Sequence, residues 1–287
     1  MMAPELVADY PAKTGEGPIW HTDHAQLYWT DIPNGILYQY NPVTDSHAVL
    51  LERDTIGGTT VQADGSLLLF GAGGVVERWN GTDVETIATL KEAAATRFND
   101  VIADPAGRVF CGTMPMDDEL GALYRLDCDG TFTRVVDDAD IPNGMGFSPD
   151  RETFYFTVSE ENSIYAYDYD ADSGGISNQR VLVSTADEAG VPDGLTVDAS
   201  GDLWSARWDG RALVRYTPTG KERDRVEFPV EKVSSATFGG PSLDQLYVTT
   251  AGGDNRLAEG ALAGSLFRFG PGVTGTTEFR SRIDPSA

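Results

Sequence analysis

Three similar segments of the chain, "GEGP", "PNGM" and "PDGL", each carry an oxygen-bearing side chain directly before a glycine. These residues are Glu16, Asn143 and Asp193. Two carboxylates and one neutral amide carbonyl form a hard-oxygen donor set whose charge balances a divalent cation. Because three protein ligands leave positions open for water and substrate, the set is typical of a catalytic metal site. The competing interpretation is that all three are ordinary turns, in which Pro, Asn, Asp and Gly are common.

A second pair of polar residues, Arg97 and Asn99, stands in the stretch "TRFNDVIADPAG". Two residues that are two positions apart on an extended strand point to the same side, so both side chains are expected to face one space. Arginine offers a fixed fork of donors, and asparagine offers a donor and an acceptor. The pair therefore suits a polyhydroxylated substrate or a carboxylate product. The alternative is a structural salt bridge from Arg97 to a neighbouring carboxylate.

The fold has to bring these distant residues together, and a repeat in the sequence indicates how. Period-two apolar runs recur six times: "HAQLYWTD", "DGSLLLFG", "AGRVFCGT", "RETFYFTV", "SGDLWSAR" and "LDQLYVTT". Their first apolar residues follow one another at intervals of 40 to 49 residues, at Leu27, Leu67, Val109, Phe154, Leu203 and Leu246. A repeat of this length holds about four strands, as in a propeller blade. A β-sandwich would not give such regular intervals, and β-helix coils are much shorter.

We therefore predict an all-β fold, a six-bladed β-propeller with four-stranded antiparallel blades, forming a single domain over residues 1–287. The segment before Glu16 is expected to supply a strand that closes the last blade and leaves no open edge. In a propeller, the first residues of the innermost strands meet at one mouth of the central channel. The residues that stand ten or eleven positions before the first apolar residues of the six runs are Glu16, Gly57, Asn99, Asn143, Asp193 and Ser235, and all but Gly57 are polar.

The composition limits the possible partners and location. The chain has 45 acidic and 21 basic residues, a net charge of −24, and such a surface repels nucleic acid and anionic membranes. The acidic residues are scattered, which indicates a solvated surface or, more specifically, adaptation to a high-salt cytoplasm. No signal peptide and no long apolar segment are found, so a cytoplasmic protein is expected. A monomer is expected because a closed propeller has no free strand edge.

Other common catalytic motifs are missing from the sequence. There is no GxSxG elbow, no Gly-rich phosphate loop and no HExxH motif, which disfavours nucleophilic serine chemistry and a histidine-bound metal. The three histidines, at positions 21, 24 and 47, are expected to lie away from the mouth. The two cysteines, Cys111 and Cys128, match neither a disulfide framework nor a CxxC metal site, so we expect them to be reduced.

Five blocks of the sequence closely resemble the family of senescence marker protein, regucalcin and gluconolactonase. They are "GEGPIW", "RFNDVIADPAGRVFCGTM", "IPNGMGFSPD", "VPDGLTVDASGDLW" and "FPVEKVSSATFGGPSLDQLYVTTA", in the order and spacing of the family. The resemblance covers nearly the whole chain. It implies a six-bladed propeller that hydrolyses a small-molecule sugar lactone with one divalent cation, which could be calcium, manganese, zinc, magnesium or iron.

The resemblance also implies roles for individual residues. Glu16, Asn143 and Asp193 match the metal ligands of the family, and Asp193 also matches its proton acceptor. Arg97 and Asn99 match its substrate contacts. Where some relatives carry an acidic residue in a lid-like segment, this chain has the shorter "PMDDELG", so Asp117, Asp118 or Glu119 is a candidate substitute. Two other functions stay open: hydrolysis of other esters or organophosphates, and a non-enzymatic calcium-binding propeller.

Overall fold

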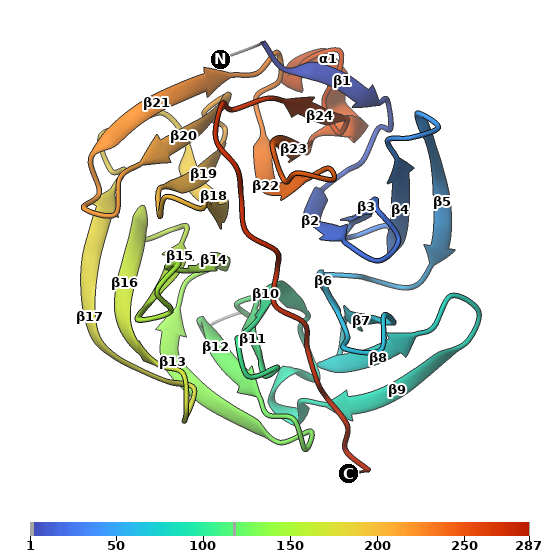
Figure 1. The fold of residues 1–287 in the computed structure, drawn as a ribbon, viewed down its shortest axis with the longest axis vertical. Helices are drawn as coiled ribbons and strands as arrows, with labels where there is room; N and C mark the ends of the chain where they lie inside the picture. The colour runs from blue at the N-terminus through green and yellow to red at the C-terminus, as the bar shows by residue number, and fades with distance from the viewer. Residues whose placement is uncertain (1–2, 117–118, 287) are drawn as a thin grey trace.

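The computed structural model describes residues 3–116 and 119–286, and it shows six four-stranded sheets arranged around a central axis (Figure 1). Every strand pair that builds these sheets is antiparallel. The predicted six-bladed β-propeller is therefore confirmed. In five blades the strands run outward from the axis in chain order, with the innermost strand first, and in the sixth blade the N-terminal strand takes the outermost place.

The strands of the first three blades follow one another in chain order. They are β2 to β5 (Gly15–His21, Gln26–Asp31, Ile36–Asn41 and Ser46–Glu52), β6 to β9 (Gly58–Val61, Leu67–Phe70, Val75–Trp79 and Val84–Thr89) and β10 to β13 (Phe98–Ala103, Val109–Thr113, Gly121–Leu126 and Phe132–Ala139).

The next two blades are β14 to β17 (Pro142–Phe147, Thr153–Val158, Ser163–Asp170 and Gly175–Ser184) and β18 to β21 (Val191–Val197, Leu203–Trp208, Ala212–Tyr216 and Glu222–Glu227). The sixth consists of β22 (Val233–Gly239), β23 (Gln245–Thr250), β24 (Leu266–Phe269) and β1 (Glu5–Ala8).

The last blade is closed by the N-terminal strand, as expected from the sequence. Strand β1 pairs with β24, with Glu5 opposite Arg268 and Leu6 opposite Phe267. The helical elements of the described chain are short: η1 (Lys91–Ala93), η2 (Gly253–Asn255) and α1 (Arg256–Glu259). Within the described residues, no helix has the length and apolar character needed to cross a membrane.

Five of the six innermost strands contain a bulge near their start. In β2, β10, β14 and β18, three residue steps on the inner strand match two on its neighbour, and β22 has a similar shift. Only β6 pairs residue for residue among these inner strands. A bulge inserts one unpaired residue and re-aims the side chains beside it. The residues that could do chemistry therefore lie where the strands depart from regular pairing.

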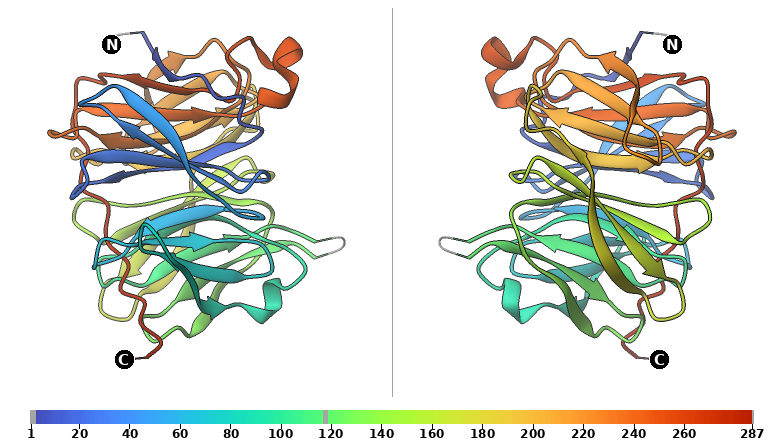
Figure 2. Two further views of the ribbon diagram at one scale, coloured as in Figure 1. Left: turned by 90° about the vertical axis from the view of Figure 1, so that its right-hand side faces the viewer. Right: turned by 90° about the vertical axis from the view of Figure 1, so that its left-hand side faces the viewer.

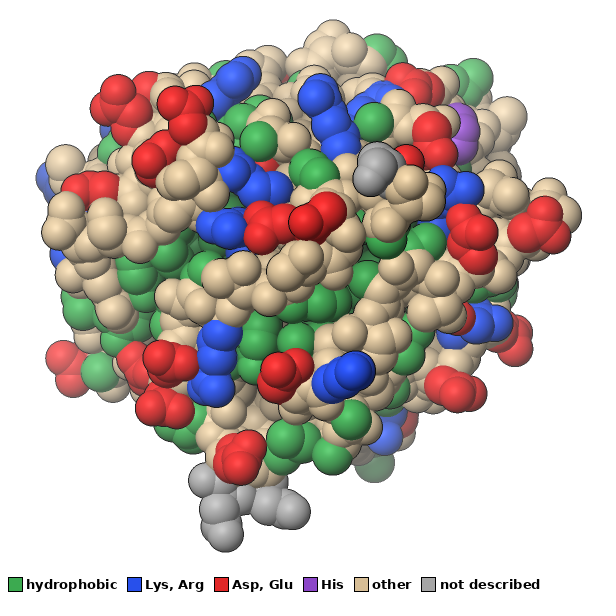
Figure 3. Space-filling model, turned by 90° about the horizontal axis from the view of Figure 1, so that it is seen from below, with side chains coloured by type: hydrophobic (Ala, Val, Ile, Leu, Met, Phe, Trp, Pro, Cys, Tyr) green, Lys and Arg blue, Asp and Glu red, His purple; other side chains and the backbone are tan. Residues whose placement is uncertain are grey.

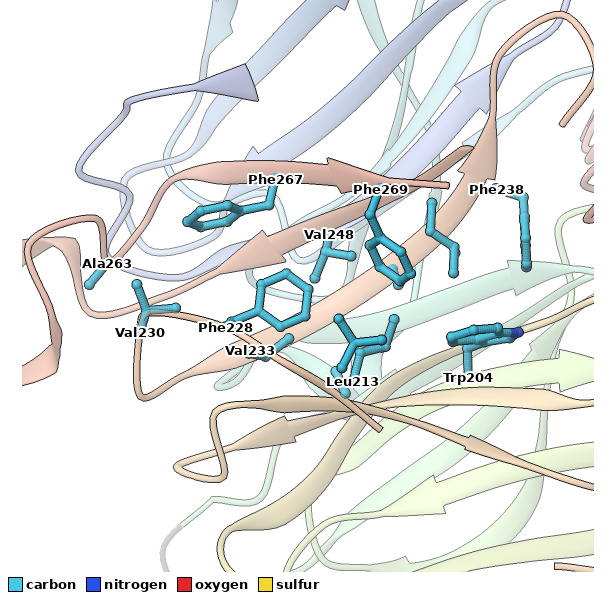
Figure 4. Packing of buried hydrophobic residues seen from close by; sticks show 14 residues of the cluster. Trp204, Leu213, Phe228, Val230, Val233, Phe238, Val248, Ala263, Phe267 and Phe269 are labelled. Atoms are coloured by element: carbon cyan, nitrogen blue, oxygen red, sulfur yellow. The ribbon is translucent and has the colours of Figure 1, made fainter. Parts of the chain in front are cut away.

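Large apolar side chains fill the space between neighbouring blades, as Figure 4 shows for blades five and six. The Phe228 ring lies edge-on to Phe267 at 5.7 Å, and Trp204 lies edge-on to Phe238 at 6.4 Å. Edge-to-face pairs of this kind add to the stabilisation from apolar burial. This packing holds the blades at fixed distances, which the inner strands need if their first residues are to meet.

The C-terminal segment 274–284 crosses the central channel on one face of the propeller (Figures 1 and 2). Its backbone bonds to blades two, three, five and six: Ser281 to Val61, Arg282 to Gly107, Thr274 to Ala199 and Gly275 to Leu243. These partners lie at the last residue of an inner strand or in the turn that follows one, so the segment covers the mouth opposite the strand starts. The Glu278 and Phe279 side chains line the channel beneath it.

Charged side chains of both signs are dispersed over the face seen in Figure 3, with Lys and Arg lying among the more numerous Asp and Glu. Both cysteines are free: Cys111 is buried on β11, and Cys128 is half-buried. This agrees with the expectation that they form no disulfide.

Candidate functional site

A cavity of about 270 Å³ opens at the mouth where the inner strands start. All five residues singled out in the sequence line it: Glu16, Arg97, Asn99, Asn143 and Asp193. They come from blades one, three, four and five, across up to 177 positions of sequence between Glu16 and Asp193. The fold therefore brings the whole predicted set together. The size and concave shape of the cavity suit a small molecule.

The acidic residues at the floor of the cavity are almost completely buried. Glu16 and Asp193 are each 4% exposed. One carboxylate oxygen of Glu16 accepts a hydrogen bond from the amide of Gly17 at 2.9 Å. Gly17 has φ of +53°, a left-handed conformation that glycine adopts easily. The glycine after Glu16 thus lets the backbone turn so that its own amide holds the carboxylate.

The glycines after Asn143 and Asp193 serve a different purpose, which is close approach between blades. A Cβ placed on Gly144 would lie 2.3 Å from the amide nitrogen of Leu195, and one on Gly194 would lie 2.2 Å from Ser235 Oγ. Neither contact is sterically possible without movement. Inner strands of neighbouring blades therefore touch at these points, which brings the two side chains to the same small space.

The amide and guanidinium groups of the site are joined by hydrogen bonds. Arg97 donates to Asn99 Oδ1 at 2.7 Å, and Asn99 donates through Nδ2 to Asn143 Oδ1 at 2.7 Å. Asn143 in turn donates through Nδ2 to Ser159 Oγ at 2.8 Å. Within the described chain, the ion pairs do not include Arg97. The alternative of a structural salt bridge from this residue is therefore not what the geometry shows.

The site has more negative than positive charge. Burial raises the pKa of Glu16 well above its usual range, and the charges of Asp193 and Asp100 raise it further. Burial likewise raises the pKa of Asp193, with Asp100 adding to the effect. Arg97 lowers the pKa of Glu16 only as a minor contribution. Ionised carboxylates in this space thus lack sufficient compensation from the protein itself.

The donor set fits a divalent cation. Two buried carboxylates with raised pKa and an amide oxygen offer the hard ligands and the negative charge that such an ion requires. In the part of the chain that the structure describes, no three His, Cys, Asp or Glu side chains converge as a metal site. A cation here would have to be held by Glu16 and Asp193 together with the amide Asn143.

Asp100 is a further acidic residue near the site that the sequence pattern does not single out. It occupies the bulge of β10, at the place where the other three frames have Gly17, Gly144 and Gly194. Burial raises its pKa to about 7, opposed by Arg97. Its side chain lines the channel beneath the cavity. The sequence does contain a signal for Asp100, because this aspartate stands where the other three frames have a glycine.

An apolar wall around the polar floor is also unpredicted. It is formed by Ile32, Met114, Ile141, Val191 and Trp208. Ile141 has φ of +57°, a strained conformation for a β-branched residue. Such strain is concentrated at functional sites, and here it places an isoleucine at the head of β14 beside the cavity. A wall of this kind suits the carbon face of a small ring.

The acidic segment after "GTM" gives a mixed result. Asp117 and Asp118 lie outside the described residues. Glu119 is exposed and lines a separate depression with Met116 and Tyr124, not the central cavity. The three histidines also lie elsewhere: His21 is at the far end of β2, and none of them lines the cavity.

Comparison with known proteins agrees with this geometry. Residues 14–252 match the family described as "SMP-30/Gluconolactonase/LRE-like region". The chain is 49% identical to pentonolactonase XacC of Haloferax volcanii over 284 residues, covering 96% of this chain and 97% of that protein. It is 33% identical to regucalcin of Homo sapiens over 290 residues, with 96% and 97% covered.

A solved structure has the same overall fold as this chain. The calcium-binding protein regucalcin from Agrobacterium tumefaciens superposes with a TM-score of 0.90 at 26% identity, covering 98% of both chains. The family match extends over most of the chain and includes every residue of the candidate site. The chain therefore belongs to the SMP-30/gluconolactonase/LRE-like family.

Proposed function

We propose that this protein hydrolyses a sugar lactone to the corresponding sugar acid with the help of one divalent cation. The observation that carries the proposal is the convergence of Glu16, Asn143 and Asp193 at the floor of a small cavity, beside Arg97 and Asn99. Support for the substrate class comes from the relative named as a pentonolactonase, at 49% identity over almost the full length. A role in sugar catabolism, inside the cytoplasm, is part of the same proposal.

The residues of the cavity suit each part of the reaction. Water adds to the ring carbonyl carbon, the bond between that carbon and the ring oxygen breaks, and a proton reaches the leaving oxygen. Asp193 takes the proton of the attacking water and passes it on to this oxygen, and burial, which raises its pKa, makes its carboxylate a stronger base. Arg97 and Asn99 hold the hydroxyl groups of the sugar, which fixes the ring for attack.

A divalent cation held by Glu16, Asn143 and Asp193 would supply Lewis acidity, which stabilises negative charge on oxygen. The apolar wall with Trp208 and Met114 limits access of bulk water and packs against the carbon face of the ring. Calcium, manganese, zinc, magnesium and iron all accept oxygen ligands to some degree, so the donor set leaves the choice among them to experiment.

Metal removal tests the proposal. Protein stripped with a chelator is expected to release little acid from pentono- and hexonolactones, and adding back one divalent metal should restore the release. The assay should run at molar salt, because the net charge of −24 favours solubility and activity there. If aryl esters or organophosphates are hydrolysed and no lactone is, the ester-hydrolase alternative replaces the proposal. Tight calcium binding without any turnover would favour a binding protein.

Replacing Arg97 with alanine is expected to raise KM for the lactone about tenfold or more, with kcat much less affected. The guanidinium contributes donors for substrate hydroxyls and does not take part in proton transfer. Steady-state kinetics on two lactones of different ring substituents measure both constants, and the preference between the two should change. The matched control is Arg151→Ala, an exposed arginine outside the cavity. An unchanged KM would remove Arg97 from the substrate contacts.

A further inference from the structure

A buried serine, Ser159, is hydrogen-bonded to Asn143, one of the proposed ligands. Ser159 follows β15, is 2% exposed and lines the cavity. Its backbone amide donates to the carbonyl of Ile141 at 3.2 Å, so its main chain is fixed to the head of β14. Its hydroxyl donates to the carbonyl of Pro192 at 2.7 Å and accepts from Asn143 Nδ2.

The hydrogen-bond chain that contains Ser159 has a single possible direction. At one end stands Arg97, whose guanidinium can only donate, so the atom of Asn99 that faces it has to be the oxygen. The other amide atom of Asn99 lies 2.9 Å from the carbonyl of Pro142, which can only accept, so that atom is the nitrogen. Asn99 therefore has one orientation, with its nitrogen toward Asn143.

The other end of the chain is fixed in the same way. Because the carbonyl of Pro192 can only accept, the proton of the Ser159 hydroxyl is committed to it. Ser159 Oγ then has only lone pairs to offer Asn143, which must present its nitrogen there. The remaining atom of Asn143 is its oxygen, which accepts from Asn99 and keeps a second lone pair free.

We propose that Ser159 is a positioning residue that keeps the carbonyl oxygen of Asn143 directed at the cation site, an inference that rests on the proposed function. Without the Ser159 hydroxyl, the amide of Asn143 loses the acceptor for its nitrogen. The amide is then held only by the hydrogen bond from Asn99 Nδ2, so it can swing about that bond and its oxygen is no longer fixed toward the cation. The same hydroxyl also ties blade four to Pro192, the residue before Asp193, so it sets the spacing of two proposed ligands.

Calorimetric titration of chelator-treated protein with calcium chloride tests the inference without any need for turnover. The Kd of Ser159→Ala is expected to be 10- to 100-fold weaker than wild type, the usual cost of removing a group that orients a metal ligand. Ser159→Thr keeps the hydroxyl and should restore most of the affinity. Ser163→Ala is the matched control, since it removes a buried hydroxyl from the same blade that bonds a backbone carbonyl outside the cavity.

A second background separates orientation from general loosening of the structure. In Asn143→Asp both side-chain atoms are oxygens, so rotation no longer hides the ligand atom. Adding Ser159→Ala to this variant should change calcium affinity by less than about threefold. Thermal melting in chelator checks that each variant is folded.

The outcomes are distinguishable. If wild-type protein binds none of calcium, manganese, magnesium and zinc, the metal site of the proposed function fails and the role of Ser159 fails with it. If wild type binds and Ser159→Ala binds equally well, only the positioning role is overturned. An equal loss in the wild-type and Asn143→Asp backgrounds would also overturn it, because a merely structural serine affects both alike.

Discussion

Asp193→Asn is expected to lower kcat/KM for the lactone by about 10³-fold or more. The amide cannot take a proton from water, and it has no negative charge with which to bind a cation. The substitution keeps the shape of the side chain. It also removes a buried charge whose pKa is raised by burial and by Asp100. The metal-free variant should therefore unfold at no lower temperature than the metal-free wild type near neutral pH.

The difference in stability between Asp193→Asn and the wild type should depend on pH, and this dependence can be measured. A carboxyl whose pKa is higher in the folded than in the unfolded state lowers the free energy of unfolding as the pH rises above its unfolded-state pKa. The cost is complete above the folded-state pKa, and it disappears as the pH falls to the ordinary carboxyl range. The advantage of Asp193→Asn in melting temperature should thus be present at pH 8 and fade toward pH 4. Asp187→Asn, an exposed position in the preceding loop, is the matched control. Turnover close to wild type in Asp193→Asn would refute the assignment of this residue.

Gly144→Ala is expected to damage both stability and activity. The added Cβ would lie 2.3 Å from the Leu195 amide nitrogen and 2.6 Å from the Asp193 carbonyl oxygen, so β14 and β18 have to separate. Overpacking of this kind costs about 3 kcal/mol in the free energy of unfolding. The separation also moves Asn143 away from Asp193, and misplacement by about 1 Å can reduce turnover about 100-fold. Chemical denaturation and lactone kinetics measure the two effects.

Gly81→Ala is the control for the steric argument. Gly81 has φ of +97°, and nothing lies within 4 Å of the position of its Cβ. Its substitution therefore carries a conformational cost of about 1–2 kcal/mol without any clash. Activity should be unchanged in this variant. If Gly144→Ala behaved like Gly81→Ala, close contact between the inner strands would not be what positions the site.

The repeated strands of this fold can be predicted from the sequence because strand alternation and turns depend on residues that are close together in the chain. Strand alternation with turns recurs at near-equal intervals, and each anchor such as Leu27 or Leu203 lies on the second strand of its blade. Closure by the N-terminal segment follows from the need to cover an open edge. The candidate ligands Glu16, Asn143 and Asp193 could be predicted to lie close together because equivalent positions in a repeat occupy equivalent places around the axis.

The features that the sequence does not reveal depend on irregular strand pairing within a blade and on contacts between blades. The bulge in β10 is a product of how that strand pairs with β11, and it alone explains why Asp100 faces the channel. The role of Ser159 appears only when the carbonyl of Pro192, in the next blade, lies within hydrogen-bond distance. The left-handed conformation of Ile141 is likewise imposed by the surroundings, since its own side chain disfavours it.

The C-terminal segment covers the mouth of the central channel that lies opposite the cavity, so the cavity has one open end. Because this mouth is covered, the acid formed is expected to leave by the same opening that admits the next lactone. Arrival and departure therefore exclude each other, and the product acid should behave as a competitive inhibitor. At low salt the net charge of −24 should assist clearance, because it repels the anionic product and not the neutral lactone, and this assistance should fade as salt screens the charge.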